Sequence, residues 1–354
     1  MWRPANTRSM LDSSGLALPI DDADLSRILA VVGAHWEVST KESYGAGLLV
    51  YHVWCDLRGV SERQRCPMDR ALLLAFISAC AGTYSGLALC NIVYGIRAWH
   101  IVHGQHWVMD NPEVEAVLEG ASQLAPANSR RAKRTPWTIA MINQVRAHLD
   151  LTLPFDAAVF ACLTSTFWSA SRLGEMTVSS LTVFDPSKHI KVSDVSSTID
   201  RHGASVTVFH LPCTKCSATG EDIFWAVQTG PADPSAAYQN HISVNKPLDS
   251  EFLFSYCHKS GRRRPLTRTA FLARIGEAAT AAGLNVPAGH GLQIGAVLEY
   301  LLRGVPFDVV KSLGHWSSDA FILYLRQHAV IIAPYIQDTP LQSEFIRYTM
   351  PPTR

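Results

Sequence analysis

Apolar residues recur at helical spacing through the first third of the chain. Leu25 and Leu29 follow the acidic residues 21–24, which can cap the start of a helix. Further helices are predicted from about residue 40 to before Gly59, over 68–81 and over 87–103. No stretch before residue 130 alternates convincingly as a strand does. The first third is therefore predicted to be an all-α unit.

Beyond residue 130 the pattern becomes mixed. The stretch 204–211 alternates as a strand should, and 221–227 is rich in β-forming residues, so 212–220 is predicted to be the long tip of a hairpin. Helices are predicted over 138–149, 157–169, 269–282, 292–303, 306–313 and 318–328, and the second of these is apolar nearly all round and should be buried. The predicted fold class is mainly α with a small β-sheet or hairpin, an α+β fold.

A basic segment bracketed by prolines divides the chain. It contains Arg130, Arg131, Lys133 and Arg134 and has no apolar stripe. Such a run is typical of a solvated linker, or of a linker that lies along an anionic polymer and binds phosphates by counterion release. The predicted organisation is a flexible leader at 1–20, a helical domain at 21–125, the basic linker at 126–136 and a second domain at 137–354.

The overall composition is that of a folded protein with nearly balanced charge. The 354 residues include 31 Lys and Arg against 30 Asp and Glu, with 47% hydrophobic residues, which excludes disorder for most of the chain. The net charge of +1 means that any DNA-binding face has to concentrate its positive charge locally. The uncharged stretch between Arg70 and Arg97 is interrupted by a polar turn at 82–86, so two buried helices are predicted there and no membrane span.

The eight cysteines are scattered, and the chain does not begin with the order of charges and apolar residues typical of a signal peptide. Reduced thiols in an intracellular protein are therefore expected. Cys213 and Cys216 form one C-x₂-C pair, which is half of a usual zinc site. We predict no metal there and interpret the pair as two thiols that flank Lys215.

The C-terminal third holds residues whose order is more informative than any one of them. His290 lies in a glycine-rich block at 289–295, His315 and Trp316 follow a second glycine, and Tyr324 lies nine positions after His315. Singly, these would be interpreted as structural histidines and a core tyrosine. Together they resemble the catalytic end of the tyrosine recombinases, which break and rejoin DNA, and are especially similar to members from fungal mobile elements.

Two upstream segments extend the resemblance to roughly residues 20–340. The segment 169–175 is similar to the first catalytic box of that family, which makes Arg172 a catalytic arginine and Glu175 its supporting acid. The hairpin tip is similar to the motif that presents the catalytic lysine, here Lys215. The helical first third and basic linker are similar to the family's core-binding domain and its connection.

The resemblance implies phosphoryl transfer without a cofactor or a metal. Tyr324 would attack a DNA phosphodiester and form a 3′-phosphotyrosyl bond, with His290 as the candidate base. Arg172 would neutralise the developing charge, and Lys215 would protonate the departing 5′ oxygen. His315 and Trp316 would hold a non-bridging oxygen and the packing around it. Double-stranded DNA is the implied partner, and self-association into a dimer or tetramer on DNA is expected.

A second basic cluster comprises Arg262, Arg263, Arg264 and Arg268. By itself it is typical of a solvated loop, and it is also a weak match to a nuclear localisation signal, which favours a nuclear location. The resemblance implies that it contacts the DNA backbone near the active site.

One position departs from the family's pattern. The second member of its His-x-x-Arg box is Gln293 here, a neutral amide in place of a planar, always charged guanidinium. Either activity is attenuated, or a neighbouring cation such as Arg303 or Arg262 substitutes, or the protein binds DNA without cutting it. The predicted function is a site-specific recombinase or integrase. The alternatives are a catalytically inactive DNA-binding descendant and a helical protein-interaction module.

Overall fold

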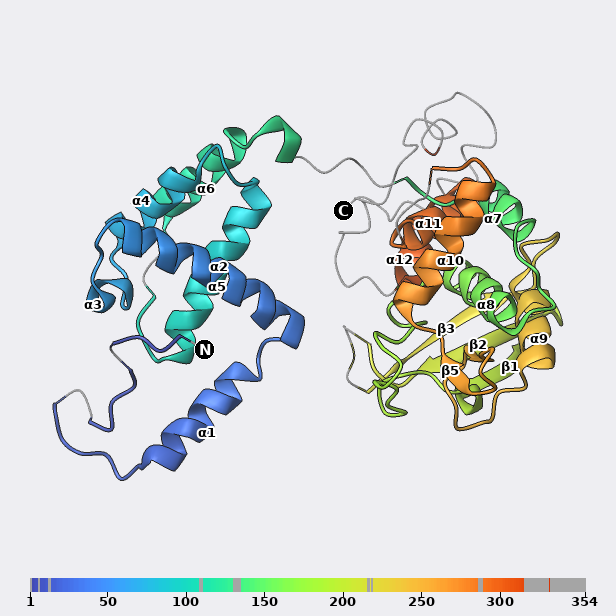
Figure 1. Cartoon of the computed structure of the whole chain (residues 1–354), viewed down its shortest axis with the longest axis horizontal. Coiled ribbons are helices and arrows are strands. Elements are labelled where there is room, and N and C mark those ends of the chain that lie inside the picture. The colour runs from blue at the N-terminus through green and yellow to red at the C-terminus, as the bar shows by residue number, and fades with distance from the viewer. Residues whose placement is uncertain are drawn as a thin grey trace, which may run out of the picture. The chain divides into compact units, whose positions relative to one another are not determined.

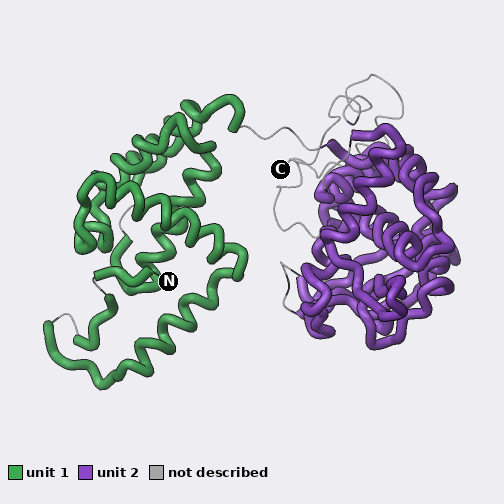
Figure 2. The backbone as a smooth tube through the Cα atoms, viewed as in Figure 1, with its two compact units in different colours: residues 1–132 green, residues 133–354 purple. Residues whose placement is uncertain are grey.

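The computed structural model describes residues 2–5, 7–11, 14–107, 111–129, 135–214, 217, 219–285, 289–314 and 331. The chain divides into two compact units, residues 1–132 and residues 133–354 (Figure 2). Each unit has a hydrophobic core of its own.

The described part of the first unit is helical, as its apolar spacing predicts. Its helices are α1 (Asp22–Gly33), α2 (Val38–Leu57), α3 (Glu62–Arg65), α4 (Arg70–Cys80), α5 (Gly86–Val102) and α6 (Pro112–Gln123), followed by the 3₁₀ turn η1 (Ala127–Ser129). Helices α2 and α5 pack closely because Gly95 has no side chain: a Cβ there would lie 2.9 Å from the carbonyl oxygen of Tyr44. Helix α6 was not predicted from the sequence.

The N-terminal segment, predicted to be a leader, contacts this unit at two points. The ring of Trp2 stacks on His52 of α2 at 4.0 Å, and its carbonyl accepts a hydrogen bond of 2.9 Å from the indole of Trp99. The guanidinium of Arg8 donates to the carbonyl of Ile101 at 3.0 Å. These contacts attach the segment to α2 and α5.

The second unit combines helices with two small antiparallel sheets (Figure 1). Its elements are α7 (Ile139–Arg146), α8 (Pro154–Trp168), η2 (Val192–Asp194), β1 (Val195–Ile199), β2 (Ser205–Leu211), β3 (Glu221–Ala226), α9 (Pro234–Asn245), β4 (Ser255–Cys257), β5 (Arg263–Pro265), α10 (Arg268–Ala281), α11 (Gly291–Leu302) and α12 (Phe307–Leu313). The mainly α fold with small sheets confirms the predicted fold class.

The predicted hairpin is present as β2 and β3. Leu211 pairs with Glu221, so the hairpin tip is the segment 212–220. The sheet gains a third strand because β1 pairs along the other edge of β2. Strand β1, helix α9 and the β4–β5 pair were not predicted. Strand β1 is mostly exposed and carries three hydroxyl residues in five, so its sequence lacks an alternating apolar face.

Helix α8 is the centre of the second core. Every residue from Asp156 to Trp168 is buried, which confirms the prediction of a helix buried on all sides. It packs against α9, α10, α11, β3 and β4. The segments just before and just after α8 therefore lie at opposite ends of the core, about 22 Å apart at the helical rise per residue.

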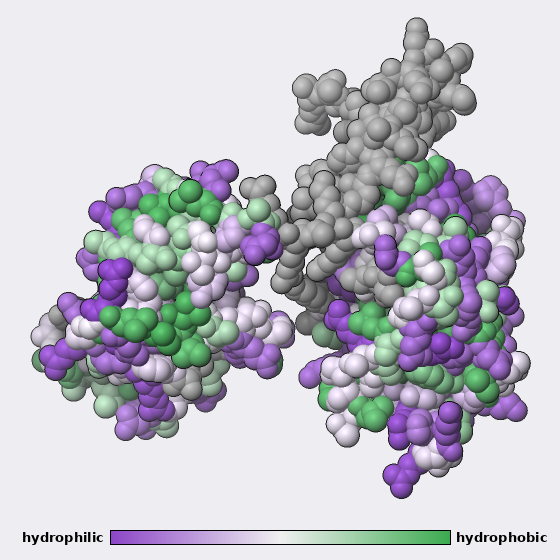
Figure 3. Space-filling model, turned by 45° about the horizontal axis from the view of Figure 1, so that its top comes forward, coloured by the Kyte–Doolittle hydropathy of each residue, from purple (hydrophilic) through white to green (hydrophobic). Residues whose placement is uncertain are grey.

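No helix in the described part of the chain combines the length and the apolar character needed to cross a membrane. Hydrophobic residues nevertheless reach the surface (Figure 3). On α2, Leu49, Val53 and Leu57 are exposed at intervals of four residues and form a stripe along one side of the helix.

Candidate active site

The segment that follows α8 holds the first predicted catalytic box in a tight turn. Ala170 adopts a left-handed conformation with φ of 51°, which an alanine rarely adopts. Glu175 binds Arg172 through both of its carboxylate oxygens. One oxygen accepts a hydrogen bond from the Arg172 backbone amide and the other accepts one from the Arg172 guanidinium, both at 2.9 Å. The Arg172 side chain remains 29% exposed and that of Glu175 only 12%. The ion pair fixes the guanidinium while leaving part of it accessible to an anion.

The His290 block lies against this turn. Gly289 is buried so tightly on Leu173 that a Cβ at residue 289 would lie 2.6 Å from the Leu173 side chain. Leu173 directly follows Arg172 and Gly289 directly precedes His290, so the two boxes are neighbours. His290 is half-buried at the N-cap of α11. The N-terminus of a helix carries partial positive charge, which favours an anion at this position.

Gln293 joins the two boxes in a way that the sequence does not reveal. Its side-chain amide donates a 3.0 Å hydrogen bond to the carbonyl of Ala170, in the turn before Arg172. The residue is only 2% exposed, and among the described residues its side-chain oxygen has no hydrogen-bond partner. The observed role of Gln293 is therefore to hold the turn that carries Arg172.

Helix α11 is anchored by two further contacts that sequence reasoning missed. The backbone amide of Trp137 donates to the carbonyl of Gly291 at 3.0 Å, and Gly295 packs on the same Trp137 backbone with no room for a Cβ. In the last turn of α11, the Tyr300 hydroxyl donates to the carbonyl of Trp168. The only sequence signal for these contacts is the glycine spacing in 289–295.

Tyr300 lies on α11 about 15 Å from His290 at the helical rise per residue, and it is unsuited to act as a nucleophile. Its hydroxyl hydrogen is committed to Trp168, and burial raises the pKa of Tyr300 to about 12. A nucleophile must lose its proton in the reaction, so a phenol with a raised pKa and a buried hydrogen bond is disfavoured. The nucleophile predicted from the sequence stays Tyr324, which lies outside the described residues.

Arg303 does not replace the missing guanidinium at position 293. It lies ten residues further along α11, about 15 Å away at the helical rise per residue. Its guanidinium donates to Glu299 at 2.8 Å and to Gln228 at 2.7 Å, and it lies over the Trp168 ring. Arg303 thus stabilises the far end of α11.

The second basic cluster does not lie as one group beside Arg172. Arg263 donates to the carbonyls of Asn245 and Lys246, at 2.9 and 2.7 Å, and so caps the C-terminus of α9. Arg264 lines a cavity at the N-terminal end of α8, the end opposite to Arg172. Arg262 is exposed in the β4–β5 turn, and Arg268 is exposed in the first turn of α10.

The described residues that flank positions 215 and 216 in the hairpin tip are bonded to one another. The amide of Thr214 donates to the carbonyl of Ser217 at 2.8 Å, and its hydroxyl donates to Glu221 at 2.9 Å. The Ser217 amide donates back to the Thr214 hydroxyl at 3.0 Å. Gly220 has φ of 89° and approaches the carbonyl of Leu211, which lets the tip rejoin β3.

Several predicted site residues lie outside the described residues. These are Lys215, His315, Trp316 and Tyr324 of the proposed reaction, Cys216 of the C-x₂-C pair, and Arg130, Arg131, Lys133 and Arg134 of the linker. Among the residues that are described, no group of three or more His, Cys, Asp or Glu is arranged to hold a metal ion.

Comparisons with known proteins find relatives by structure alone. No protein-family model matches the chain, and no curated protein matches it in sequence. Among solved structures, a XerH site-specific recombinase bound to its palindromic difH substrate has a TM-score of 0.54 at 12% identity, with 83% of this chain and 79% of that one covered.

Two structures of lambda integrase are also similar to this chain. A dimer of residues 75–356 bound to a COC′ core site has a TM-score of 0.50 at 14% identity, covering 85% of this chain and 94% of that one. A tetramer bound to a Holliday junction has a TM-score of 0.50 at 13% identity, covering 91% of this chain and 79% of that one. The chain therefore has the fold of the tyrosine recombinases over most of its length.

Proposed function

We propose that the protein is a site-specific DNA recombinase or integrase of the tyrosine type. The observation that carries the proposal is the ion pair of Arg172 with Glu175, which lies beside the His290 block. The chain that holds this pair has the fold of such recombinases. A guanidinium that is always charged and held in place is suited to neutralise a phosphate as it gains charge in the transition state.

In the proposed reaction the Tyr324 oxygen attacks a DNA phosphodiester in line and forms a 3′-phosphotyrosyl bond. His290 accepts the proton of the tyrosine hydroxyl, and Lys215 gives a proton to the departing 5′ oxygen. His315 and Trp316 support a non-bridging oxygen. The 5′-hydroxyl of a second strand then attacks the phosphotyrosyl bond and releases Tyr324. One ester bond is exchanged for another at each step, so the exchange needs neither a cofactor nor a metal.

One observation favours a second candidate function, a DNA-binding protein without strand cleavage. Gln293 takes the place of the family's second arginine, and its amide is committed to the Ala170 carbonyl. Loss of one preorganised donor at a comparable oxyanion site lowers the rate by about 10²–10³. Slow cleavage is thus the expected behaviour of the first candidate, and absence of cleavage that of the second.

Trapping of a covalent adduct distinguishes the two candidates. DNA duplexes that bind the full-length protein are first selected from a random-sequence pool. Each selected duplex is then nicked next to each candidate cleavage position, so that cleavage releases a short fragment that cannot be rejoined. We expect slow accumulation of a denaturation-resistant protein–DNA adduct that Tyr324→Phe abolishes, with DNA binding retained. If binding is present but neither the wild type nor Gln293→Arg gives an adduct, the second candidate is correct.

The proposal has consequences for partners and location. Double-stranded DNA is the substrate, and recombination between two sites requires a dimer or tetramer of this chain on DNA. Since the substrate is chromosomal or mobile-element DNA, as in the fungal mobile elements whose recombinases the sequence resembles, the proposed location is intracellular and nuclear. The near-neutral chain predicts modest affinity for DNA of arbitrary sequence, with an affinity that decreases as salt increases.

A further inference from the structure

A cavity of about 410 Å³ lies at the N-terminal end of α8, distant from the candidate active site. Leu153, Phe155 and Asp156 form one wall, and the opposite side comes from β4, the β4–β5 turn, β5 and α10. Arg172 follows the other end of α8, about 22 Å away at the helical rise over 15 residues. The cavity is therefore separate from the site of the proposed reaction.

The charges that line this cavity do not cancel. Asp156 is buried and binds Arg274 through two hydrogen bonds of 2.7 and 2.8 Å, so these two charges neutralise each other. Lys259 and Arg264 also line the cavity, and within the described residues the side chain of neither forms a hydrogen bond or an ion pair. Arg264 is half-buried, where a cation without a partner is costly. Two positive charges thus remain without a counter-charge.

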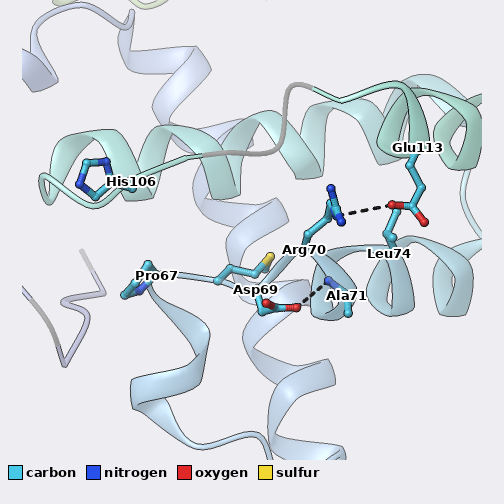
Figure 4. Close-up of a pocket in the computed structure, with 8 residues that line it drawn as sticks. Pro67, Asp69, Arg70, Ala71, Leu74, His106 and Glu113 are labelled. Carbon is cyan, nitrogen blue, oxygen red and sulfur yellow. Dashed lines mark hydrogen bonds and ion pairs between the residues drawn. The ribbon is translucent and has the colours of Figure 1, made fainter.

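A second cavity, in the first unit, shows the contrasting case. It measures about 470 Å³ and is lined by Asp69, Arg70 and Glu113 (Figure 4). There Arg70 pairs with Glu113 at 3.4 Å, and Asp69 accepts from the amide of Ala71 at 2.7 Å. Its one arginine is thus paired with a carboxylate, and Asp69 adds a negative charge, so this cavity offers no unpaired cation to a phosphate.

The cavity at α8 also has an aromatic side. Phe155 and Tyr256 line it, and their ring centroids lie 4.9 Å apart with an angle of 45° between the ring planes; Phe155 is half-buried and Tyr256 is 7% exposed. Helix α8 begins with Pro154 and has no side-chain cap, so the positive end of its dipole adds to the charge of Lys259 and Arg264. The volume is at the lower end of the range for small-molecule sites, about 300–1,000 Å³.

We infer that this cavity binds a nucleotide unit: a phosphate held by Arg264 and Lys259, with the base against Phe155 and Tyr256. Arg264 provides a planar fork that matches a phosphate, and aromatic rings accept a base of any sequence by stacking. The same chemistry is present in a free nucleotide and in a DNA strand end, and the experiment below separates these sources. The inference does not depend on the proposed recombinase activity.

Calorimetric titration of the full-length protein tests this site. The probes are the four deoxynucleoside 5′-monophosphates, inorganic phosphate and a 5′-phosphorylated decanucleotide. We expect one of them to bind, and Arg264→Gln and Lys259→Gln each to weaken that binding by about tenfold or more. Arg201→Gln removes the same charge from the exposed β1–β2 turn and should leave the affinity unchanged.

The outcomes separate the sources and the two proposals. Binding of a mononucleotide that depends on Arg264 identifies a free nucleotide, and binding of the decanucleotide alone identifies a strand end. If no probe binds, or if binding is equal in wild type and in both cavity variants, the inference is wrong. Lys259 is exposed, so Lys259→Gln folds even if Arg264→Gln does not. Tyr324→Phe should not alter this binding, whereas it abolishes the adduct of the proposed reaction.

Discussion

Replacement of Gln293 by arginine tests the assignment of the candidate site most directly. The substitution restores the charge that the family has at this position, but it places that charge in a residue that is 2% exposed. The new guanidinium can donate to the Ala170 carbonyl in place of the amide, and its remaining donors need other partners. In the absence of DNA, the described residues offer no counter-charge bonded to position 293.

The magnitudes favour a destabilised protein in the absence of DNA. Removal of the unpaired Gln293 side-chain oxygen recovers about 1–3 kcal/mol, the cost of a buried unsatisfied group. Desolvation of the new charge costs several kcal/mol. The expected net loss is about 3 kcal/mol, which lowers the Tm of a unit of this size by roughly 6–12 °C. A bound DNA phosphate supplies the counter-charge, so DNA should restore much of the loss.

Two measurements check this prediction. Thermal denaturation with and without the selected duplex gives the Tm, and the nicked-duplex assay gives the rate of adduct formation. We expect Gln293→Arg to be less stable than wild type without DNA, to gain more from DNA, and to form adduct about 10²–10³ times faster. Gln293→Leu is the uncharged control: it loses the bond to Ala170 but also removes the unpaired side-chain oxygen, so its Tm should stay near that of wild type, with no gain in rate. An arginine variant with unchanged Tm and unchanged rate would refute the placement of this residue beside the reacting phosphate.

Three further predictions follow from the same unit. Glu175→Gln removes the charge that orients Arg172, so adduct formation should slow by at least tenfold with little change in DNA affinity. Equal rates of adduct formation in this variant and in wild type would contradict a positioning role for Glu175. Gly295→Ala should lower the free energy of unfolding, measured by urea denaturation, by about 3 kcal/mol because a Cβ has no room at this position. Gly120→Ala is the control: a Cβ at residue 120 meets no atom within 4 Å, so this variant should not be destabilised. Burial lowers the pKa of His241 to about 4, so the folded state binds fewer protons than the unfolded state between pH 4 and 6.5. The free energy of unfolding that the neutral His241 contributes is therefore fully present above about pH 6.5 and decreases toward pH 4. About 2 kcal/mol should be lost between pH 7.5 and 5.0 on this account, and His241→Gln should show a smaller loss; an unchanged pH dependence would show that other groups cause it.

Local sequence determined much of the helical framework. Helix α8 is apolar on every side, so burial was predictable from its composition alone, and the structure buries it. The β2–β3 hairpin was predictable because alternation and turn residues act over short distances. Strand β1 was not, because its polar residues become a strand only through pairing with β2. The pairing of Arg172 with Glu175 spans three residues and requires no long-range information.

The roles of Gln293 and of the arginine run show what only the tertiary structure decided. The sequence establishes that position 293 is a neutral amide, but its bond to Ala170 joins residues 123 positions apart. Likewise, three consecutive arginines look equivalent in the sequence. Strand geometry directs neighbouring side chains to opposite faces, so Arg263 caps α9 while Arg264 lines the cavity beside α8. Residue type and spacing thus determined which chemistry is available, and long-range packing decided which groups are already bonded and which remain for a ligand.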